Sequence, residues 1–297
     1  MQLSKYTPHF ALLCTNLIWA VAYPMYHLVL NKYIEPISIL TATLIVSAIF
    51  SFVPLLWEKR ERVHGDDVVA LIGAAILIAV IRKGLLIFAL SKTSPIDGSI
   101  ISTFTPIVVL VISIIIGMER FTISKFAGLM LGLCGAIGVI LTSGGDATHP
   151  TQEMLGNVMV LGCAVISAVY MVWFKSLVKK YSPVTILRYL FCISAIVVTP
   201  FGAKSLVHTD FSAMPTHIFM AVLYLIIMPT YIPNLLQNYA LKYVQPTVSG
   251  TFAYLQPVVA GAVSVYIGVE SPEWETLLFA ALIFVGVGVV VRSYANK

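Results

Sequence analysis

A succession of long apolar segments constrains the fold of this 297-residue chain more than any other feature. A helix needs about 20 predominantly apolar residues to cross the hydrocarbon core of a bilayer. Segments that meet this criterion lie near residues 8–30, 36–57, 68–90, 95–117, 124–142, 156–176, 183–203, 217–241, 246–268 and 274–292. The connections between them are short and leave no room for a soluble domain. The sequence therefore predicts an all-α integral membrane protein of about ten transmembrane helices.

Charged residues are too scarce for a soluble protein. They make up 10% of the chain, and hydrophobic residues make up 59%, whereas about 25% of a soluble domain is charged. The net charge of +5 comes from basic residues in short loops, so we expect a lipid bilayer and not a nucleic acid as the partner. The four cysteines lie in apolar segments without paired spacing, so neither a disulfide nor a metal site is expected, and no cofactor is predicted.

The first apolar segment could be mistaken for a cleaved signal peptide. Residues 20–22 read Ala-Val-Ala, a sequence of small residues typical of a cleavage site. The apolar run nevertheless continues to Leu30, and the segment has a counterpart in the second half of the chain. We therefore expect it to be retained as the first helix.

Lys and Arg residues are distributed unevenly between the two sides of the predicted bundle. The side that carries the N-terminus holds Lys5, Lys59, Arg60, Arg62, Arg120, Lys125, Lys175, Lys179, Lys180, Lys242, Arg292 and Lys297. The opposite side holds Lys32, Lys92 and Lys204. Because Lys and Arg accumulate in cytoplasmic loops, we expect both termini to lie in the cytoplasm, with the protein in the plasma membrane (the inner membrane of a bacterium).

The second half of the chain repeats the pattern of the first. With a shift of 151 positions, residues 89–119 align with residues 240–270 without a gap, and Pro106 meets Pro257. Earlier in each half the shift is 147 positions, and Tyr23 meets Tyr170. Each repeat contains five predicted helices, so the second repeat, residues 148–297, is expected to be inverted relative to the first, residues 1–147. Inverted repeats are typical of secondary transporters, which bind solute near the membrane midplane.

The repeated residues give the sequence a family likeness. They are Trp19, Pro36, Ala89-Leu90, Pro106 and Gly117-Met118-Glu119 in the first half, and Tyr170, Pro183, Ala240-Leu241, Pro257 and Gly268-Val269-Glu270 in the second. In this order they resemble the EamA-type members of the drug/metabolite transporter superfamily over essentially the whole chain. The resemblance implies a fold in which helices one, three and four, with their counterparts six, eight and nine, surround a central cavity. It also implies export of amino acids or other small metabolites, as in many relatives.

The chain departs from this family at two places. The second helix has Thr41 or Thr43 where the family often has Arg, and the third helix carries Arg82 and Lys83 well inside the span. An ionised side chain near the bilayer centre costs about 2.5–3.5 kcal/mol on insertion scales, so these two must face water, a partner or a solute. Successive helix residues point in different directions, so we expect at most one of them to point straight into a cavity. Snorkelling, or bonding to backbone carbonyls, is the alternative.

The distribution of acidic residues narrows the class of solute. No Asp or Glu lies deep in any predicted span, although a carrier of cationic drugs usually needs a buried carboxylate. The cavity is therefore predicted to favour a carboxylate or phosphate group.

Polar and aromatic residues on four further spans are candidates for solute binding. Span one presents Asn16, Trp19 and Tyr23 on one helix face, and span eight carries Tyr231, Asn234, Gln237 and Asn238. Ser102 and Tyr254 occupy corresponding stretches of spans four and nine. We predict that these residues bind the solute together with Arg82 and Lys83; packing between helices is the alternative.

Other residues are assigned gating or structural roles, namely His27, Pro106, Arg188, Pro229, Pro233 and Pro257. The two prolines of span eight break the backbone hydrogen-bond ladder at the midplane. His27 could respond to pH, and Arg188 could snorkel to the interface. Spans five and ten are rich in glycine and are interpreted as peripheral packing helices and a candidate dimer face.

These features together predict an alternating-access membrane transporter of a small anionic or zwitterionic organic metabolite, an amino acid exporter. Arg82 or Lys83 would hold the carboxylate, the aromatic side chains of span one the solute side chain, and span eight the amino group. The alternatives are an exchanger of phosphate-bearing metabolites with the same fold, and a channel-like facilitator. An enzyme is not expected, and the chain is expected to act as a monomer or homodimer.

Overall fold

The computed structural model describes residues 7–57, 61–117, 122–142, 150–269 and 273–295. Within these ranges the regular structure is helical, apart from one isolated bridge between Leu30 and Ile34. The loop charges Lys5, Lys59, Arg60, Arg120 and Lys297 lie outside the described residues, as do Glu119 and Glu270 of the repeated motif. The prediction of an all-α fold is confirmed.

The helices follow the predicted apolar segments. The first half forms α1 (Thr7–Val29), α2 (Pro36–Phe50), η1 (Val53–Leu56), α3 (Gly65–Ala74), η2 (Ala75–Arg82), α4 (Lys83–Leu90), α5 (Pro95–Ser102), α6 (Thr105–Ile115) and α7 (Ile123–Thr142). The second half forms α8 (Pro150–Trp173), α9 (Lys175–Lys180), α10 (Pro183–Val207), α11 (Thr216–Ile227), α12 (Tyr231–Tyr243), α13 (Pro246–Thr251), η3 (Phe252–Tyr254), α14 (Leu255–Tyr266) and α15 (Trp274–Ala295).

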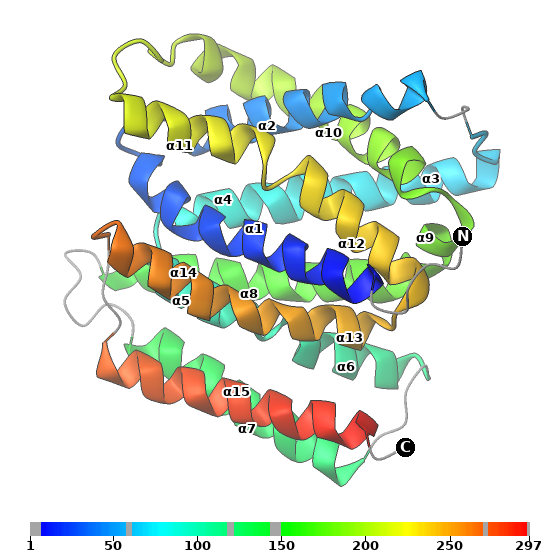
Figure 1. Ribbon diagram of the computed structural model, residues 1–297, viewed down its shortest axis with the longest axis vertical. Helices are drawn as coiled ribbons and strands as arrows, with labels where there is room; N and C mark the ends of the chain where they lie inside the picture. Colours follow the sequence, from blue (N-terminus) through cyan, green and yellow to red (C-terminus); the bar gives the residue numbers. More distant parts are fainter. Residues whose placement is uncertain (1–6, 58–60, 118–121, 143–149, 270–272, 296–297) are drawn as a thin grey trace.

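These helices run side by side across the molecule (Figure 1). One edge is formed by α2, α10 and α11, and the opposite edge by the pair α7 and α15, with α1, α4 and α8 between them. The beginning of α1 and the end of α15 lie at the same end of the bundle (Figure 1). Helices α1, α4 and α8 thus lie in the middle of the bundle.

Eight helical stretches of the described residues are long and apolar enough to cross a membrane. They are Thr7–Val29, Pro36–Leu56, Gly65–Leu90, Pro95–Ile115, Thr151–Trp173, Pro183–Val207, Thr216–Tyr243 and Pro246–Tyr266. The remaining two predicted spans contain shorter apolar stretches, Ile123–Gly135 in α7 and Leu277–Gly286 in α15. The chain is an integral membrane protein, and the number of ten spans stays a prediction.

Several spans begin at a proline, which sits well at the first position of a helix because no backbone N–H is needed there. Two of these prolines follow a serine that caps the helix. The Ser94 hydroxyl accepts a hydrogen bond from the backbone N of Asp97 at 3.1 Å, before α5. The Ser182 hydroxyl accepts one from the backbone N of Thr185 at 3.2 Å, before α10. The sequence thus fixes where these spans start.

Four of the central spans are interrupted within their length. In the third span, η2 is a π-helix between α3 and α4. In the fourth, α5 ends at Ser102 and α6 begins at Thr105, and in the ninth η3 separates α13 from α14. In the eighth, residues 228–230 separate α11 from α12. Such interruptions leave backbone groups outside the helical ladder, and inside a membrane they are tolerated where protein or a cavity covers them.

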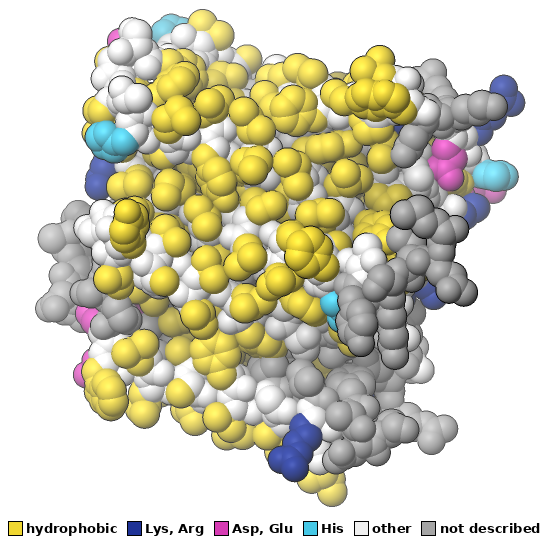
Figure 2. Space-filling model, in the orientation of Figure 1, with side chains coloured by type: hydrophobic (Ala, Val, Ile, Leu, Met, Phe, Trp, Pro, Cys, Tyr) yellow, Lys and Arg dark blue, Asp and Glu magenta, His cyan; other side chains and the backbone are white. Residues whose placement is uncertain are grey.

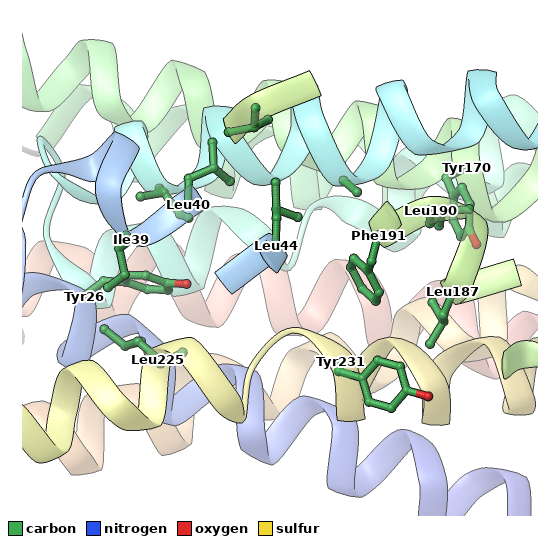
Figure 3. Packing of buried hydrophobic residues seen from close by; sticks show 14 of the residues in the cluster. Tyr26, Ile39, Leu40, Leu44, Tyr170, Leu187, Leu190, Phe191, Leu225 and Tyr231 are labelled. Carbon is green, nitrogen blue, oxygen red and sulfur yellow. The ribbon is translucent and has the colours of Figure 1, made fainter. Parts of the chain in front are cut away.

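The main hydrophobic core joins both halves of the chain. Figure 3 shows side chains from α1, α2, α8, α10, α11 and α12 in this core, among them Leu44, Leu190 and Phe191. The outer face is also apolar: hydrophobic side chains cover the middle of the face in Figure 2, and Lys, Arg, Asp, Glu and His side chains gather at the two ends of the helices. This distribution suits a protein surrounded by lipid.

At the end of the molecule where α3 begins, polar contacts join two segments that are distant in sequence. Lys180 forms a salt bridge with Asp67 at 2.5 Å, and the Tyr181 hydroxyl donates to the same carboxylate at 2.6 Å. The backbone N of Ser182 donates to Glu61 Oε2 at 2.9 Å. These contacts hold the first turn of α3 and the segment before it against the end of α9 and the residues that lead into α10.

The contact between Glu61 and Ser182 is expected to make stability depend on pH in acid. Partial burial tends to raise the pKa of Glu61, but the hydrogen bonds from Ser182 and Thr185 outweigh it and lower the pKa below its usual value. A lowered pKa stabilises the folded state above the unfolded value of about 4.3, and this stabilisation is lost as pH falls through the folded pKa. The protein with Glu61→Gln should therefore have a lower Tm than the unmodified protein near neutral pH, and the difference should shrink below about pH 4.3. Thermal unfolding in detergent at several pH values measures this; a difference that is the same at every pH would contradict it.

Candidate functional site

The central helices enclose a cavity of about 70 Å³. A buried water needs at least about 10–15 Å³ on this scale, so the cavity has room for several waters or for a small organic solute. The lining residues come from α1, η2, α4, α5, α6, α8, the turn before α12, α12, α13, η3 and α14. They therefore belong to predicted spans one, three, four, six, eight and nine, as the family resemblance implied.

Arg82 lies at the end of the π-helix η2 and lines the cavity. Its Nε donates a hydrogen bond to the Ser167 hydroxyl on α8 at 2.6 Å. Its guanidinium carbon lies 5.8 Å from the centroid of the Trp19 ring on α1, within the range of a cation–π interaction. The hydrogen bonds found among the described residues engage Nε but neither Nη group. The guanidinium is thus held in place with both Nη groups left to donate to a ligand.

Lys83 also lines the cavity, but its side chain reaches different helices. Its Nζ donates to the Tyr26 hydroxyl at 3.2 Å and to the Thr230 hydroxyl at 3.0 Å, and lies 5.8 Å from the centroid of the Tyr26 ring. The side chain is 8% exposed. Helix geometry predicted that at most one of the two cations would point straight into the cavity, and this prediction is wrong, because both line it. The cavity extends from α8, where Arg82 donates a hydrogen bond to Ser167, to the turn before α12, where Lys83 donates one to Thr230.

The described lining residues carry these two cations and contain no Asp, Glu or His. The nearest hydrogen-bond partners of Arg82 and Lys83 are neutral hydroxyl groups. Like charges held close together in a poorly hydrated site repel one another, and either a negative group beside Arg82 or loss of the proton from Lys83 relieves that repulsion. The electrostatics of the cavity therefore favour a solute with an anionic group.

A chain of hydrogen bonds crosses the cavity between α1, α5 and α14. The Tyr23 hydroxyl shares a hydrogen bond with the Ser102 hydroxyl at 2.5 Å and donates to Gln256 Oε1 at 3.3 Å. Gln256 Nε2 donates to Asn16 Oδ1 at 2.7 Å, and Asn16 Nδ2 donates to the backbone O of Leu12 at 2.8 Å. One hydrogen-bond network thus contains Asn16, Tyr23 and Ser102, which were predicted from two separate features of the sequence to bind the solute.

The interruption of span eight follows from its two prolines. Pro233 has no N–H to donate to the backbone O of Pro229 four residues earlier, so that carbonyl is left for another donor. The indole Nε1 of Trp19 donates to it at 3.0 Å. The backbone O of Thr230, the next residue along the chain, accepts a hydrogen bond from Asn234 Nδ2 at 2.6 Å. The break is therefore covered by side chains that also line the cavity.

The remaining candidates of span eight and span nine are divided between the cavity and the packing around it. Asn234 and Gln237 line the cavity. Asn238 lies behind the lining: its Oδ1 accepts from the Tyr170 hydroxyl at 2.7 Å. Tyr231 packs against the rings of Phe50 and Phe191, with centroids 6.3 and 6.2 Å away, and is not a lining residue. Tyr254 packs against Phe284 at 6.1 Å and is not a lining residue either.

Most residues assigned to gating or structure also lie outside the lining. Pro229 lines the cavity, whereas Pro233, Pro106, Pro257 and His27 do not. Arg188 on α10 is 9% exposed, and its guanidinium carbon lies 6.0 Å from the centroid of the Phe52 ring.

Several lining residues were not selected from the sequence, namely Tyr26, Thr105, Cys163, Ser167, Tyr170, Ser249 and Gln256. The internal repeat could have found some of them. Tyr170 is the counterpart of Tyr23 at the shift of 147, and Gln256 is the counterpart of Thr105 at the shift of 151; all four line the cavity. Matching positions of the two repeats are therefore a useful signal for site residues.

An all-α membrane protein whose central spans enclose a solute-sized, cationic cavity has the architecture of a polytopic membrane transporter. The sequence model of the EamA-like transporter family matches the chain twice, at residues 7–141 and at residues 154–292. The chain belongs to this family. Its members are transporters and not enzymes, so the chain is a transporter that lies in a lipid bilayer and binds a small solute.

Individual relatives agree with this membership. The chain is 27% identical over 299 residues to a Streptantibioticus cattleyicolor protein named "Probable terminal-alkyne amino-acid exporter", covering 100% of this chain and 97% of that protein. It is 23% identical over 285 residues to an uncharacterised transporter of Archaeoglobus fulgidus, covering 94% and 95% of the two chains. A solved crystal structure superposes with a TM-score of 0.69 at 18% identity over 99% of both chains, and it supports the fold alone.

Proposed function

We propose that this transporter is an alternating-access carrier that exports a small solute with a carboxylate, an amino acid, from the cytoplasm. The observation that carries the proposal is the state of Arg82, whose Nε bonds Ser167 and whose Nη groups have no partner among the described residues. Two parallel N–H donors match the two oxygens of a carboxylate, and such paired, charge-assisted bonds are strong.

The rest of the lining offers complementary groups for an amino acid. The rings of Trp19 and Tyr23 form an apolar wall beside Arg82, suited to the solute side chain. Acceptors for an ammonium group are available from the amide oxygens of Asn234 and Gln237 and from the Ser249 hydroxyl, which is buried without a hydrogen-bond partner in the described part of the chain. The name of the relative from Streptantibioticus cattleyicolor supports the same class of solute.

The orientation of the protein in the membrane is inferred from the charge pattern of the loops. The excess of Lys and Arg on the side of the N-terminus supports a bacterial inner-membrane protein with both termini in the cytoplasm. Export then means that the solute enters the cavity from the side that carries these basic loops.

Counterflow in proteoliposomes tests this function. Vesicles containing the purified protein are loaded in turn with unlabelled amino acids, dicarboxylates or sugar phosphates. Uptake of a labelled solute of the same class from outside the vesicles is then measured. We expect saturable uptake when the vesicles contain an amino acid, because a carrier returns faster when it is loaded.

The other outcomes separate the alternatives. Counterflow with sugar phosphates, inhibited by inorganic phosphate but not by amino acids, would replace the proposal by a phosphate-bearing metabolite exchanger. Uptake that does not saturate and does not respond to internal solute would indicate a channel-like facilitator. No exchange with any anionic class would contradict the role given to Arg82.

A further inference from the structure

Lys83 differs from the other described lining groups because it loses its charge when it releases a proton. Arginine keeps its charge in proteins, so Arg82 is a permanent cation. The tyrosine hydroxyls of Tyr23, Tyr26 and Tyr170 and the thiol of Cys163 are neutral, and losing a proton would create an anion in a buried site. Lys83 becomes neutral when it loses a proton, and a neutral amine costs less to bury than an ammonium.

The surroundings of Lys83 do not fix its charge. Besides the solute cavity, Lys83 lines a second, smaller cavity beside it. The side chains that α2, α10, α12 and the turn before α12 contribute to this smaller cavity are all uncharged: Leu44, Leu190, Phe191, Asn234 and Thr230. On α11, Tyr224 donates its hydroxyl to the backbone O of Ile18 at 2.8 Å. The cation that faces Lys83 is its neighbour Arg82, and no carboxylate lines either cavity in the described part of the chain.

The two hydrogen-bond partners of Lys83 can serve both forms of its amine. An ammonium donates to the hydroxyl oxygens of Tyr26 and Thr230, as observed. A neutral amine has a lone pair, and either hydroxyl can rotate to donate to it. Lys180, by contrast, is paired with the carboxylate of Asp67, which holds it in the charged form.

Lys83 also lines two cavities, each of which has polar side chains in its lining. One is the solute cavity, and the other is a space of about 20 Å³ lined by Arg82, Lys83, Thr230 and Asn234 among others. That volume suffices for one water, and the polar side chains supply the hydrogen-bond partners that a buried water needs. A proton leaving or reaching Nζ therefore has polar neighbours on both sides.

The position of Lys83 connects its charge with the moving parts expected of a carrier. Thr230 lies in the break between α11 and α12, and Tyr26 lies on α1. Discontinuous helices of this kind form the binding sites of many transporters, around which one repeat moves against the other. Loss of the charge on Lys83 would weaken a hydrogen bond that joins α4 to this break.

We propose that Lys83 is the proton-exchanging residue of the carrier and that it couples solute export to proton entry. This inference rests on the proposed function. The carboxylate of a bound amino acid pairs with Arg82, and its ammonium lies toward Asn234, which shares the smaller cavity with Lys83. Two ammonium groups in so small a space are like charges, so the presence of one disfavours the other. The solute enters from the cytoplasm as Lys83 releases its proton there; after the solute has left on the far side, the amine takes up a proton from that side. One solute leaves for one proton that enters.

The proton released on solute binding can be measured directly. The purified protein is placed in a weakly buffered detergent solution with a pH indicator, and the amino acid identified by counterflow is added. The unmodified protein should release protons, close to one for each bound solute, in a pH range where Lys83 is charged before binding. The protein with Lys83→Met should release none. Lys175→Met removes another buried lysine, which lies outside the cavity lining and donates to the Gln245 side chain at 2.7 Å, and it should release as many protons as the unmodified protein.

Coupling is then tested in proteoliposomes with the membrane potential clamped by potassium and valinomycin. Vesicles that are acid inside should accumulate the solute up to about tenfold for each pH unit of gradient, because an antiporter exchanges solute for the outgoing proton. With Lys83→Met this accumulation should vanish, while a reduced counterflow persists and no longer depends on pH. Lys83→Arg, which is permanently charged, should also be uncoupled.

The possible failures are distinguishable. Counterflow without gradient-driven accumulation in the unmodified protein, or accumulation that survives in the Lys83→Met variant, would overturn the role of Lys83 and leave the proposed function intact. Accumulation in vesicles that are alkaline inside would replace antiport by co-transport. Absence of counterflow in the unmodified protein would overturn the proposed function itself, and the inference with it. If Lys83→Met does not fold, Thr230→Val, which removes one of the two hydroxyl partners, should still shift the pH dependence of counterflow.

Discussion

The variant Arg82→Met is expected to bind its solute roughly 10- to 150-fold more weakly than the unmodified protein, and this is the largest effect on solute affinity that the site predicts. The estimate follows from the loss of hydrogen bonds between a guanidinium and a carboxylate, which contribute about 1.5–3 kcal/mol to binding. The aromatic wall stays in place, because Trp19 is held independently by its hydrogen bond to the backbone O of Pro229. The half-saturation concentration of counterflow measures the change.

Two further variants sharpen this test. Arg82→Lys keeps a positive charge but loses the paired donors, so its affinity should fall between those of the unmodified protein and Arg82→Met. Arg188→Met removes an arginine that is similarly enclosed by helices but lies outside the cavity, and it should leave the half-saturation concentration unchanged even where it lowers Tm. If Arg82→Met and Arg188→Met change counterflow equally, Arg82 has no special role in solute binding.

The sequence was sufficient to predict which segments are helical, and the family resemblance implied which helices surround the cavity. Membrane spans are recognisable from length and apolar content alone, and the break in span eight follows from Pro229 and Pro233. Arg82 and Lys83 could be selected because a charge inside a span is costly and needs a specific environment. These inferences depend on local energetics, which a sequence carries.

The rotation of each helix about its axis was harder to predict. In a soluble protein, apolar residues mark the buried face, but in a membrane both the lipid and the protein interior accept apolar side chains. Tyr231 and Tyr254 were therefore selected although they pack against Phe50 and Phe284 outside the cavity, and Gln256 was missed. Which residues face inwards is decided by contacts between helices that are distant in sequence.

The pair α7 and α15 illustrates such a contact. A Cβ atom added to Gly286 on α15 would lie 2.6 Å from the backbone O of Gly128 and 2.6 Å from the backbone N of Gly132, both on α7. One added to Gly135 would lie 2.7 Å from the backbone O of Phe279. The backbones of the two helices are thus in direct contact, and glycines of spans five and ten, interpreted from the sequence as packing residues, pack these two helices against each other. Close approach through small residues is a common way to join helices in a membrane.

Substituting alanine at two glycines of α15 should have opposite effects on stability. Alanine favours a helix over glycine by about 1 kcal/mol, so Gly288→Ala, where an added Cβ meets no atom within 4 Å, should be neutral or slightly stabilising. Gly286→Ala gains the same helix preference but pushes a methyl group into the backbone of α7, and overpacking of this kind costs about 1–3 kcal/mol. We therefore expect a lower Tm for Gly286→Ala and an equal or higher Tm for Gly288→Ala, measured by thermal unfolding in the same detergent. Since the two substitutions are chemically identical and two residues apart, equal Tm values would mean that α7 and α15 do not touch through their backbones at Gly286.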